Sequence, residues 1–353
     1  MEINDVKMNC RNYLGDRPCK PHKDGRVDCL DCKLYDPIEE KILVIKLNAA
    51  GDVIRTTPLL RKIKEEMPHS HITWVSNFPE LLPSQVDYKI RSDNKSLLWL
   101  SKMQFDIVYN LDKDPTAIAL TELIEAKKKY GFGMDRYGHC YPLNESAEHK
   151  LLTGLFDDIS RNNKKSYVEE IFEICGFNFS GEKYLLEKTV ERNWNLSQPS
   201  PVVGLNTGCG AKWTSRLWPS ENWITLAQCL AKKGIGIIWL GGRNEHEKNK
   251  QFYQRGFGFY PGYFSLEEFV DLIDQCDVIV TQVTMTLHIA IALQKRVVLM
   301  NNIFNKYEFE LYGLGEIIEP SEKCECYYSQ VCPHDSMKKI SPFVVLDAVL
   351  RQM

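Results

Sequence analysis

The chain has 353 residues, of which 44% are hydrophobic and 26% are charged, and its formal net charge is −3. This length suits two domains better than one, and the near-neutral charge gives no general affinity for nucleic acid. No apolar run is long enough to span a membrane, and the polar amino terminus lacks a signal-peptide pattern. We therefore expect a two-domain cytoplasmic protein that does not bind nucleic acid.

The chain begins with an irregular segment and then alternates between strands and helices. Residues 1–40 carry glycines and prolines among charges and have no lasting periodicity, so they need a covalent or metal staple. Apolar β-rich runs and helical spacings follow in turn. The predicted strands are 41–47, 71–77, 105–112 and 127–133, and the predicted helices are 56–67, 116–126 and 167–177.

The pattern breaks at NWNLSQPSP, residues 193–201, which reads as a linker. It then restarts with predicted strands 202–208, 236–242, 277–282 and 296–302 and helices 220–234, 265–276, 284–294 and 341–353. Two such blocks predict an α/β protein with two doubly wound, Rossmann-like domains, whose ligands bind beyond the carboxyl ends of the strands. The expected boundaries are 1–40 for a metal-binding segment, 41–195 and 196–335 for the two domains, and 336–353 for a final helix.

Asp52 stands where the first strand turns into a helix, in LNAAGD. An aspartate at a helix start commonly caps the backbone N–H groups. The alternative is a general base that faces a ligand cleft. The loop lacks the G-x-G-x-x-G spacing of a dinucleotide-binding turn.

Three loops of the second half carry groups that suit a diphosphate or a nucleoside. In NTGCGAKWTSR the glycines allow close backbone approach and the cations and hydroxyls favour an anion. LGGRN offers two further glycines, and TQVTMTLH places hydroxyls at a helix start, where free N–H groups hold phosphate. The candidate donor-binding residues are Thr207, Gly208, Gly210, Lys212, Arg216, Gly241, Gly242, Gln282, Thr284, Met285, Thr286 and His288. A lone histidine on an apolar helix is more often a core residue than a ligand contact.

Three segments together resemble glycosyltransferase family nine, the ADP-heptose:acceptor heptosyltransferases: IKLNAAGDVIRTTPLLRKIKEEMP, NTGCGAKWTSRLWPSENW and CDVIVTQVTMTLHIAIALQKRVVLM. The resemblance covers residues 41–320 and implies a GT-B fold with the donor on the second domain. It implies that Asp52 deprotonates an acceptor hydroxyl, which displaces the nucleoside diphosphate with inversion and without a metal. Arg216 matches the family's phosphate-binding lysine, and Thr284 matches a threonine that contacts the diphosphate.

One position departs from the family pattern. The family usually has Asp-Thr-Gly where this chain has Val283-Thr284-Met285, so an acid thought to contact the donor sugar is missing. Gln282 is a polar residue next to the place of the missing acid, but it lies one position before it. ADP-heptose is the expected donor, and another nucleotide sugar is the alternative.

The cysteines gather at the two ends of the chain. Cys10, Cys19, Cys29 and Cys32 give the spacing C-x8-C-x9-C-x2-C, which suits a structural zinc or iron in a reducing compartment, with His22 as a substitute ligand. Cys324, Cys326 and Cys332, with His334 nearby, form a second cluster or share ligands with the first. Some protein-modifying relatives of the family carry a cysteine-bound iron outside the catalytic cleft.

The resemblance predicts a heptosyltransferase in bacterial envelope biosynthesis, and two other functions compete with it. One is a nucleotide-sugar epimerase of GT-B fold, and the other is a non-catalytic metal-binding scaffold. The acceptor is a glycan or a protein hydroxyl. LLWLSKM, residues 97–103, offers a modest surface for peripheral membrane contact.

Overall fold

The protein is described from a computed structural model that covers residues 2–322 and 324–353. The chain divides into two compact units. The first unit comprises the chain up to Asn48, Leu59–Pro79 and Ser84–Ala147. The second comprises Ala49–Pro58, Glu80–Pro83 and Glu148–Met353. Each unit contains one sheet.

The sheet of the first unit has six strands in the order β3-β2-β1-β4-β5-β6. All neighbouring strands are parallel except β5 and β6. Its strands are β1 Lys41–Ile45, β2 His71–Ser76, β3 Tyr88–Arg91, β4 Gln104–Asn110, β5 Glu125–Met134 and β6 Cys140–Pro142. The central strand β1 is buried on both faces, as expected for a parallel sheet that helices cover.

The helices of this unit include α1 Lys20–Gly25, α3 Leu59–Glu66, α4 Asn94–Leu100 and α5 Pro115–Leu123. The helix predicted over 56–67 corresponds to α3, and a separate helix, α2 Ala50–Thr56, precedes it. Pro58 lies between them, because it lacks an N–H and disfavours helical geometry in the residue before it. The chain changes units at this break: α2 belongs to the second unit and α3 to the first.

A buried carboxylate fixes the end of β1. Asp112 accepts hydrogen bonds from the backbone N–H groups of Leu47 and Asn48, each at 2.9 Å, and pairs with the Lys46 ammonium at 3.3 Å. These residues lead directly into α2 along the chain. The loop therefore starts from a rigid anchor.

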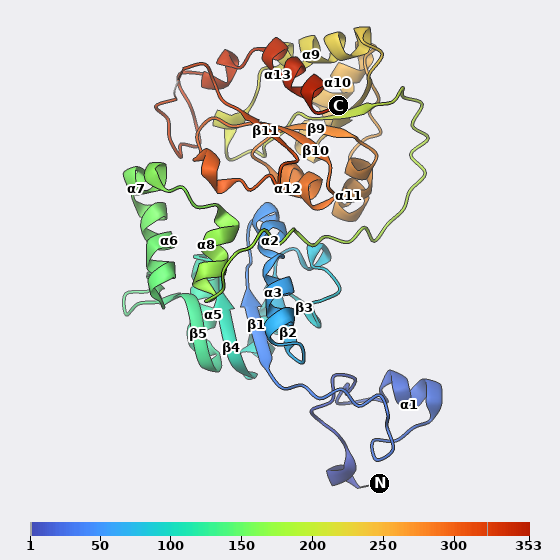
Figure 1. The fold of residues 1–353 in the computed structure, drawn as a ribbon, viewed down its shortest axis with the longest axis vertical. Helices are drawn as coiled ribbons and strands as arrows, with labels where there is room; N and C mark the ends of the chain where they lie inside the picture. The colour runs from blue at the N-terminus through green and yellow to red at the C-terminus, as the bar shows by residue number, and fades with distance from the viewer. Residues whose placement is uncertain (1, 323) are drawn as a thin grey trace. The chain divides into compact units, whose positions relative to one another are not determined.

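The sheet of the second unit is entirely parallel, in the order β11-β10-β9-β7-β8 (Figure 1). Its strands are β7 Val202–Asn206, β8 Gly236–Leu240, β9 Val278–Gln282, β10 Arg296–Met300 and β11 Gly315–Ile318. Its helices include α7 Asp157–Asn162, α8 Tyr167–Ile174, α9 Ser220–Lys232, α10 His246–Gln254, α11 Leu266–Asp274, α12 Met285–Ala292 and α13 Pro342–Arg351, and α6 Glu145–Leu155 begins at the boundary between the units.

Helices cover both faces of this second sheet. Figure 1 shows α9, α10 and α13 on one face and α11 and α12 on the other. Trp223 and Leu226 of α9 and Val345 of α13 are fully buried in one apolar cluster with Trp239 of β8. Each such side chain contributes about 1.5–3 kcal/mol on burial. The packing holds the strand ends, and with them the loops that follow, in fixed positions.

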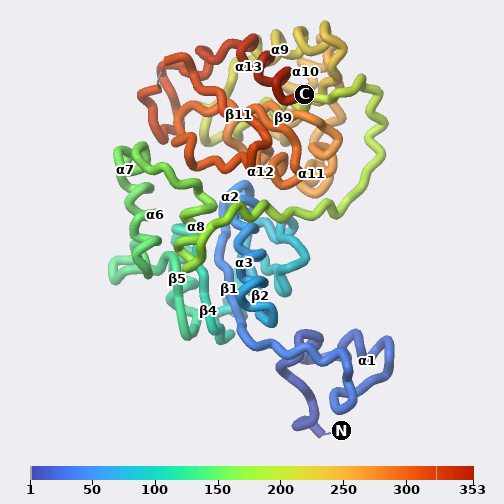
Figure 2. Tube along the Cα trace, viewed as in Figure 1, coloured from blue at the N-terminus to red at the C-terminus, as the bar shows by residue number. Residues whose placement is uncertain are grey.

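The predicted GT-B architecture of two parallel α/β units is confirmed, and each predicted domain range contains one sheet. The short strands β3, β6 and β11 were not predicted. The stretch 193–201, predicted as a linker, lies in a longer segment, 178–201, without helix or strand, which Figure 2 shows as an extended trace. That segment belongs to the second unit.

None of the helices in the described part of the chain is long and apolar enough to cross a membrane.

Candidate active site

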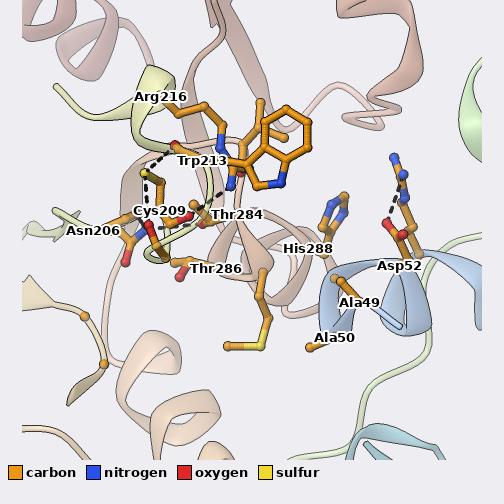
Figure 3. Close-up of a pocket in the computed structure, with 18 of the residues that line it drawn as sticks. Ala49, Ala50, Asp52, Asn206, Cys209, Trp213, Arg216, Thr284, Thr286 and His288 are labelled. Carbon is orange, nitrogen blue, oxygen red and sulfur yellow. Dashed lines mark hydrogen bonds and ion pairs between the residues drawn. The ribbon is translucent and has the colours of Figure 1, made fainter. Parts of the chain in front are cut away.

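A cavity of about 620 Å³ lies within the second unit. Its walls come from α2 and from the loops that follow β7, β8, β9 and β10 (Figure 3). These loops stand at the carboxyl ends of parallel strands, where doubly wound sheets bind ligands. The volume is in the range of small-molecule and cofactor sites.

Most of the residues predicted from sequence line this cavity. They are Asp52, Gly208, Gly210, Arg216, Gly241, Gly242, Thr284, Met285, Thr286 and His288. Three others do not line it. Thr207 is buried and its hydroxyl donates to Asn249, Lys212 is exposed, and Gln282 is fully buried at the end of β9. With its amide oriented to donate, Gln282 bonds to the carbonyls of Asn206 and Gly208, so it supports the glycine loop from behind.

Asp52 lies in the first turn of α2, and the N-cap position of that helix belongs to Ala49, whose side chain makes no cap bond. The Asp52 carboxylate pairs with Arg55 at 2.9 Å and remains about a third exposed. The Arg55 guanidinium is buried and lies 3.5 Å from the centre of the Tyr167 ring. The pair therefore orients the acid while leaving it accessible from the cavity.

Close packing of α2 on α12 depends on Gly51. A Cβ at this position would lie 2.6 Å from Cδ2 of His288 and 3.4 Å from the Met285 backbone. Burial, reinforced by the charge of Arg55, lowers the pKa of His288 to about 3, so the ring is neutral at physiological pH. His288 is thus mainly a packing partner that sets where α2, and with it Asp52, lies.

Gly51→Ala is expected to move α2 away from α12 and to cost about 1–3 kcal/mol in the free energy of unfolding, as overpacking does. The turnover number of this variant should fall as well. Adding His288→Ala should recover part of both losses, because the smaller side chain admits the new methyl group. Denaturant unfolding and turnover of the two single variants and the double variant measure this coupling. Purely additive effects of the two substitutions would contradict the packing assignment.

Arg216 and the start of α12 form the cationic end of the cavity. The Arg216 guanidinium donates to the carbonyl of Cys209 at 2.9 Å and to that of Val283. Burial lowers its pKa, but an arginine stays charged. Thr284 is the N-cap residue of α12 and makes no cap bond with its own side chain. A cation beside unfilled helix N–H groups suits phosphate oxygens.

Two charged residues near this end were not predicted from sequence. Lys248 of α10 donates to the carbonyl of Thr207 at 2.9 Å, and burial lowers its pKa. Glu245 lines the cavity and accepts from the Gly242 N–H at 3.0 Å. A Cβ on Gly208 would lie 2.2 Å from the Glu245 carboxyl, the flexible end of that side chain, so a larger residue here would displace Glu245. Lys248 and Glu245 come close to these glycines only in the folded chain, and no sequence pattern predicts it.

Figure 3 shows the two ends of the cavity. Arg216, Cys209, Asn206 and Thr284 gather at one end, Asp52 lies at the other, and His288 stands between them. Apolar side chains from the segment before and within α11 complete the wall: Phe264, Leu266 and Phe269.

An aromatic wall beside Arg216 consists of Trp213, Phe304 and Tyr328. The Phe304 ring lies 5.5 Å from that of Trp213 and 5.0 Å from that of Tyr328. The backbone and side chain of Ser215 bond to the carbonyls of Gln330 and Ser329 at 3.0 and 2.7 Å. The loop that follows Cys326 therefore holds the Arg216 segment in place.

The C-terminal cysteines converge behind that wall. The ligand atoms of Cys324, Cys326 and Cys332 all lie within 4.8 Å of one another, the only such group of metal-ligand side chains in the described part of the chain. Burial raises the pKa of Cys332, but hydrogen bonds with Ser336, Cys326 and the His334 backbone together outweigh it and the pKa falls to about 6. A thiolate is the form that binds metal. The N-terminal Cys10, Cys19, Cys29 and Cys32 line a separate cavity in the first unit.

A model of glycosyltransferase family 9 (heptosyltransferase) matches residues 98–304, more than half of the chain. A lipopolysaccharide core heptosyltransferase, OpsX, from Haemophilus influenzae is 28% identical over 114 residues, 29% of this chain and 33% of that protein. The alignment thus spans about a third of this curated relative.

Two solved structures show the same fold. A family 9 glycosyltransferase from Veillonella parvula superposes with a TM-score of 0.66 at 19% identity, covering 89% of this chain and 97% of the other. The ADP-heptose lipopolysaccharide heptosyltransferase II of E. coli superposes with a TM-score of 0.63 at 18% identity, covering 88% and 98%.

Proposed function

The chain belongs to glycosyltransferase family 9, and from this premise we propose that it transfers a heptose from ADP-heptose to an acceptor hydroxyl with inversion. The observation that carries the proposal is one cavity with a carboxylate at one end and a phosphate-type site at the other. A structural relative is described as an ADP-heptose enzyme, which supports this donor. The acceptor is a glycan or protein hydroxyl.

Asp52 is the proposed general base. Its carboxylate takes the proton of the acceptor hydroxyl, and the oxygen forms a bond to the anomeric carbon while the bond from that carbon to the phosphate oxygen breaks. ADP leaves with the bonding electrons. Pairing with Arg55 at 2.9 Å fixes the direction of the Asp52 carboxylate.

The leaving diphosphate is stabilised by groups already in place. Arg216, the N–H groups at the start of α12 and the hydroxyl of Thr284 receive the charge that develops on ADP. No metal is required for this step, because these groups supply the positive potential. The nucleoside packs against the apolar Phe264 and Phe269, and Glu245 accepts hydrogen bonds from its ribose hydroxyls.

The sugar itself is selected where this chain departs from the family pattern. Val283 and Met285 flank Thr284 and both line the cavity. They present apolar surface where the family usually has an acid and a glycine. A less polar wall favours a donor sugar that makes fewer hydrogen bonds at this point.

Donor identity is tested with a panel of nucleotide sugars. ADP-heptose and ADP are expected to raise the melting temperature of the purified protein, because each binds only the folded state. UDP- and GDP-sugars serve as matched controls and should have little effect. Stabilisation by a different nucleotide sugar, with none by ADP-heptose, would overturn the donor assignment.

The cytoplasmic location predicted from sequence belongs to the same proposal. The exposed Leu98 and Trp99 of α4 support the predicted surface for peripheral membrane contact.

We also propose that Cys324, Cys326 and Cys332 hold one structural metal ion, zinc or iron. Three converging sulfurs leave a fourth position, and the Ser336 hydroxyl is 3.2 Å from the Cys324 sulfur. Cys324 and Cys332 pack on Ile303, with Trp213 and Phe304 against the same cluster. The ion would therefore hold the aromatic wall of the donor site.

Cys332→Ser is expected to remove one equivalent of metal per chain and to weaken ADP binding, because the wall loses its anchor. Cys140→Ser, a half-buried cysteine of β6, is the matched control and should retain both. Elemental analysis and ADP titration of the two variants measure the effects. Equal metal content in the wild type and Cys332→Ser would contradict the site.

A further inference from the structure

The N-terminal segment, residues 2–40, has no core of its own. None of these residues is buried, while Ile3, Met8, Leu30 and Leu34 expose more than half of their surface. Its regular structure is limited to a single 3₁₀ turn and the six-residue helix α1. So short a segment without buried apolar side chains needs a cross-link or a bound metal to hold one conformation.

Four thiols of this segment surround a single space. Cys10, Cys19, Cys29 and Cys32 all line a cavity of about 220 Å³, and each is half-buried. Figure 2 shows that the chain before β1 loops back on itself. The cavity is therefore lined by thiols from four separate points of the segment.

The spacing of these thiols differs from that of the C-terminal cluster. In a tetrahedral zinc site the sulfurs lie about 3.8 Å apart, as follows from Zn–S bonds of about 2.3 Å. Cys324, Cys326 and Cys332 are close to this spacing, all within 4.8 Å of one another. Among the described residues no three of the N-terminal sulfurs form such a group. The N-terminal sulfurs therefore surround an open space and do not converge on one point.

We propose that Cys10, Cys19, Cys29 and Cys32 bind an iron–sulfur cluster. Four cysteine thiolates are the usual ligands of such clusters, and the irons and bridging sulfides occupy the space between the thiolates. The remaining lining fits an anionic, water-sensitive group. Lys7 and Arg17 outnumber Asp28, the one acid of the lining, and Tyr13 and Tyr35 border the same space.

The cluster fixes the segment to one edge region of the first sheet. Arg11, next to the ligand Cys10, pairs with Asp36 at 2.9 Å, with Asp87, and with the Ser70 carbonyl at 2.9 Å. Ser70 and Asp87 precede β2 and β3, so these contacts lie at the amino ends of the strands. In doubly wound sheets the catalytic loops follow the carboxyl ends of the strands, which lie at the opposite edge of the sheet. The cluster is thus assigned a structural role, separate from the proposed transfer reaction.

The test uses the full chain purified without oxygen. Acid-labile sulfide should be present, with iron in at least an equal amount because the C-terminal cysteines can add one iron, and with a broad absorption band near 400 nm. The double substitution Cys29→Ser with Cys32→Ser should lower sulfide content and this band at least tenfold, while Cys140→Ser leaves both unchanged. Sulfide reports only this site, because a single ion on the C-terminal cysteines carries none.

Zinc or iron without sulfide, or a protein that contains neither metal nor sulfide, would overturn the assignment of the cluster. If the double variant is insoluble, the metal and sulfide content of the wild type decides the question alone. Stabilisation by ADP-heptose, measured in the same preparation, reports the proposed function independently. Loss of one result without the other identifies which proposal has failed.

Discussion

Asp52→Asn is expected to lower the turnover number by about 10²–10⁴-fold, the usual contribution of a positioned general base. The amide keeps the size and shape of the carboxylate but takes up no proton from the acceptor. Donor binding should change little, because Asp52 lies at the far end of the cavity from Arg216 and Thr284. Initial rates of ADP release with acceptor, together with ADP titration, measure the two effects.

Asp158→Asn is the matched control for this substitution. Asp158 also lies in the first turn of a helix, α7, and is exposed, so it reports the general effect of removing such a charge. Asp52→Asn also leaves the buried Arg55 without this partner, so the free energy of unfolding of both variants is measured. Near wild-type turnover in a folded Asp52→Asn protein would remove Asp52 as the base.

Arg216→Met is expected to raise the donor KM by about 10–100-fold, because hydrogen bonds to a charged group contribute about 1.5–3 kcal/mol. The turnover number should fall as well, since the charge developing on ADP loses its closest cation. Arg216→Lys should recover most of the loss, because lysine keeps a point charge at the position where the family usually has one. Steady-state kinetics over a range of donor concentrations separate the effects on KM and turnover.

The control for Arg216 is Arg255→Met, an exposed arginine at the end of α10 that does not line the cavity. It removes the same charge from the same unit. Equal changes in KM for the two variants would show that Arg216 acts only through net charge. Unchanged kinetics in Arg216→Met would remove it from the donor site.

The fold was readable from sequence because its strands and helices have strong local patterns. KILVI and VIVTQ each contain a continuous apolar run, ILVI and VIV, and each strand ends at a loop that carries chemistry. The edge strand Tyr88–Arg91 was missed because it is short and mostly exposed, without an apolar pattern. The strand Cys140–Pro142 was missed because it has only three residues, none of them buried.

The site was predicted in part. Glycines, hydroxyls and Arg216 follow strand ends, and the loop rule for parallel sheets brings them together. Glu245 and Lys248 were missed because they reach the glycine loop from the chain after β8, which no spacing reveals. Gln282 was expected to face the donor, but its position on buried β9 turns it toward the Asn206 and Gly208 carbonyls. The direction in which a side chain points at the end of a strand depends on the register of that strand in the sheet.

The role of Asp52 depends on a contact that sequence does not show. Its position after a strand favoured a helix cap, yet the cap position belongs to Ala49. Gly51 against His288 and the ion pair with Arg55 then set where the carboxylate lies. The packing of α2 on α12 is long-range, so only the folded chain reveals it.

Product mass is the most direct measure of the central claim. The wild type and Asp52→Asn are each incubated with ADP-heptose and with a mixture of glycan and peptide acceptors, and products are identified by mass spectrometry. The wild type should add one heptose to an acceptor hydroxyl and release one ADP, and Asp52→Asn should give at most about a hundredth of that product. Heptose transfer at equal rates by both proteins, or transfer only from a different nucleotide sugar, would contradict the account.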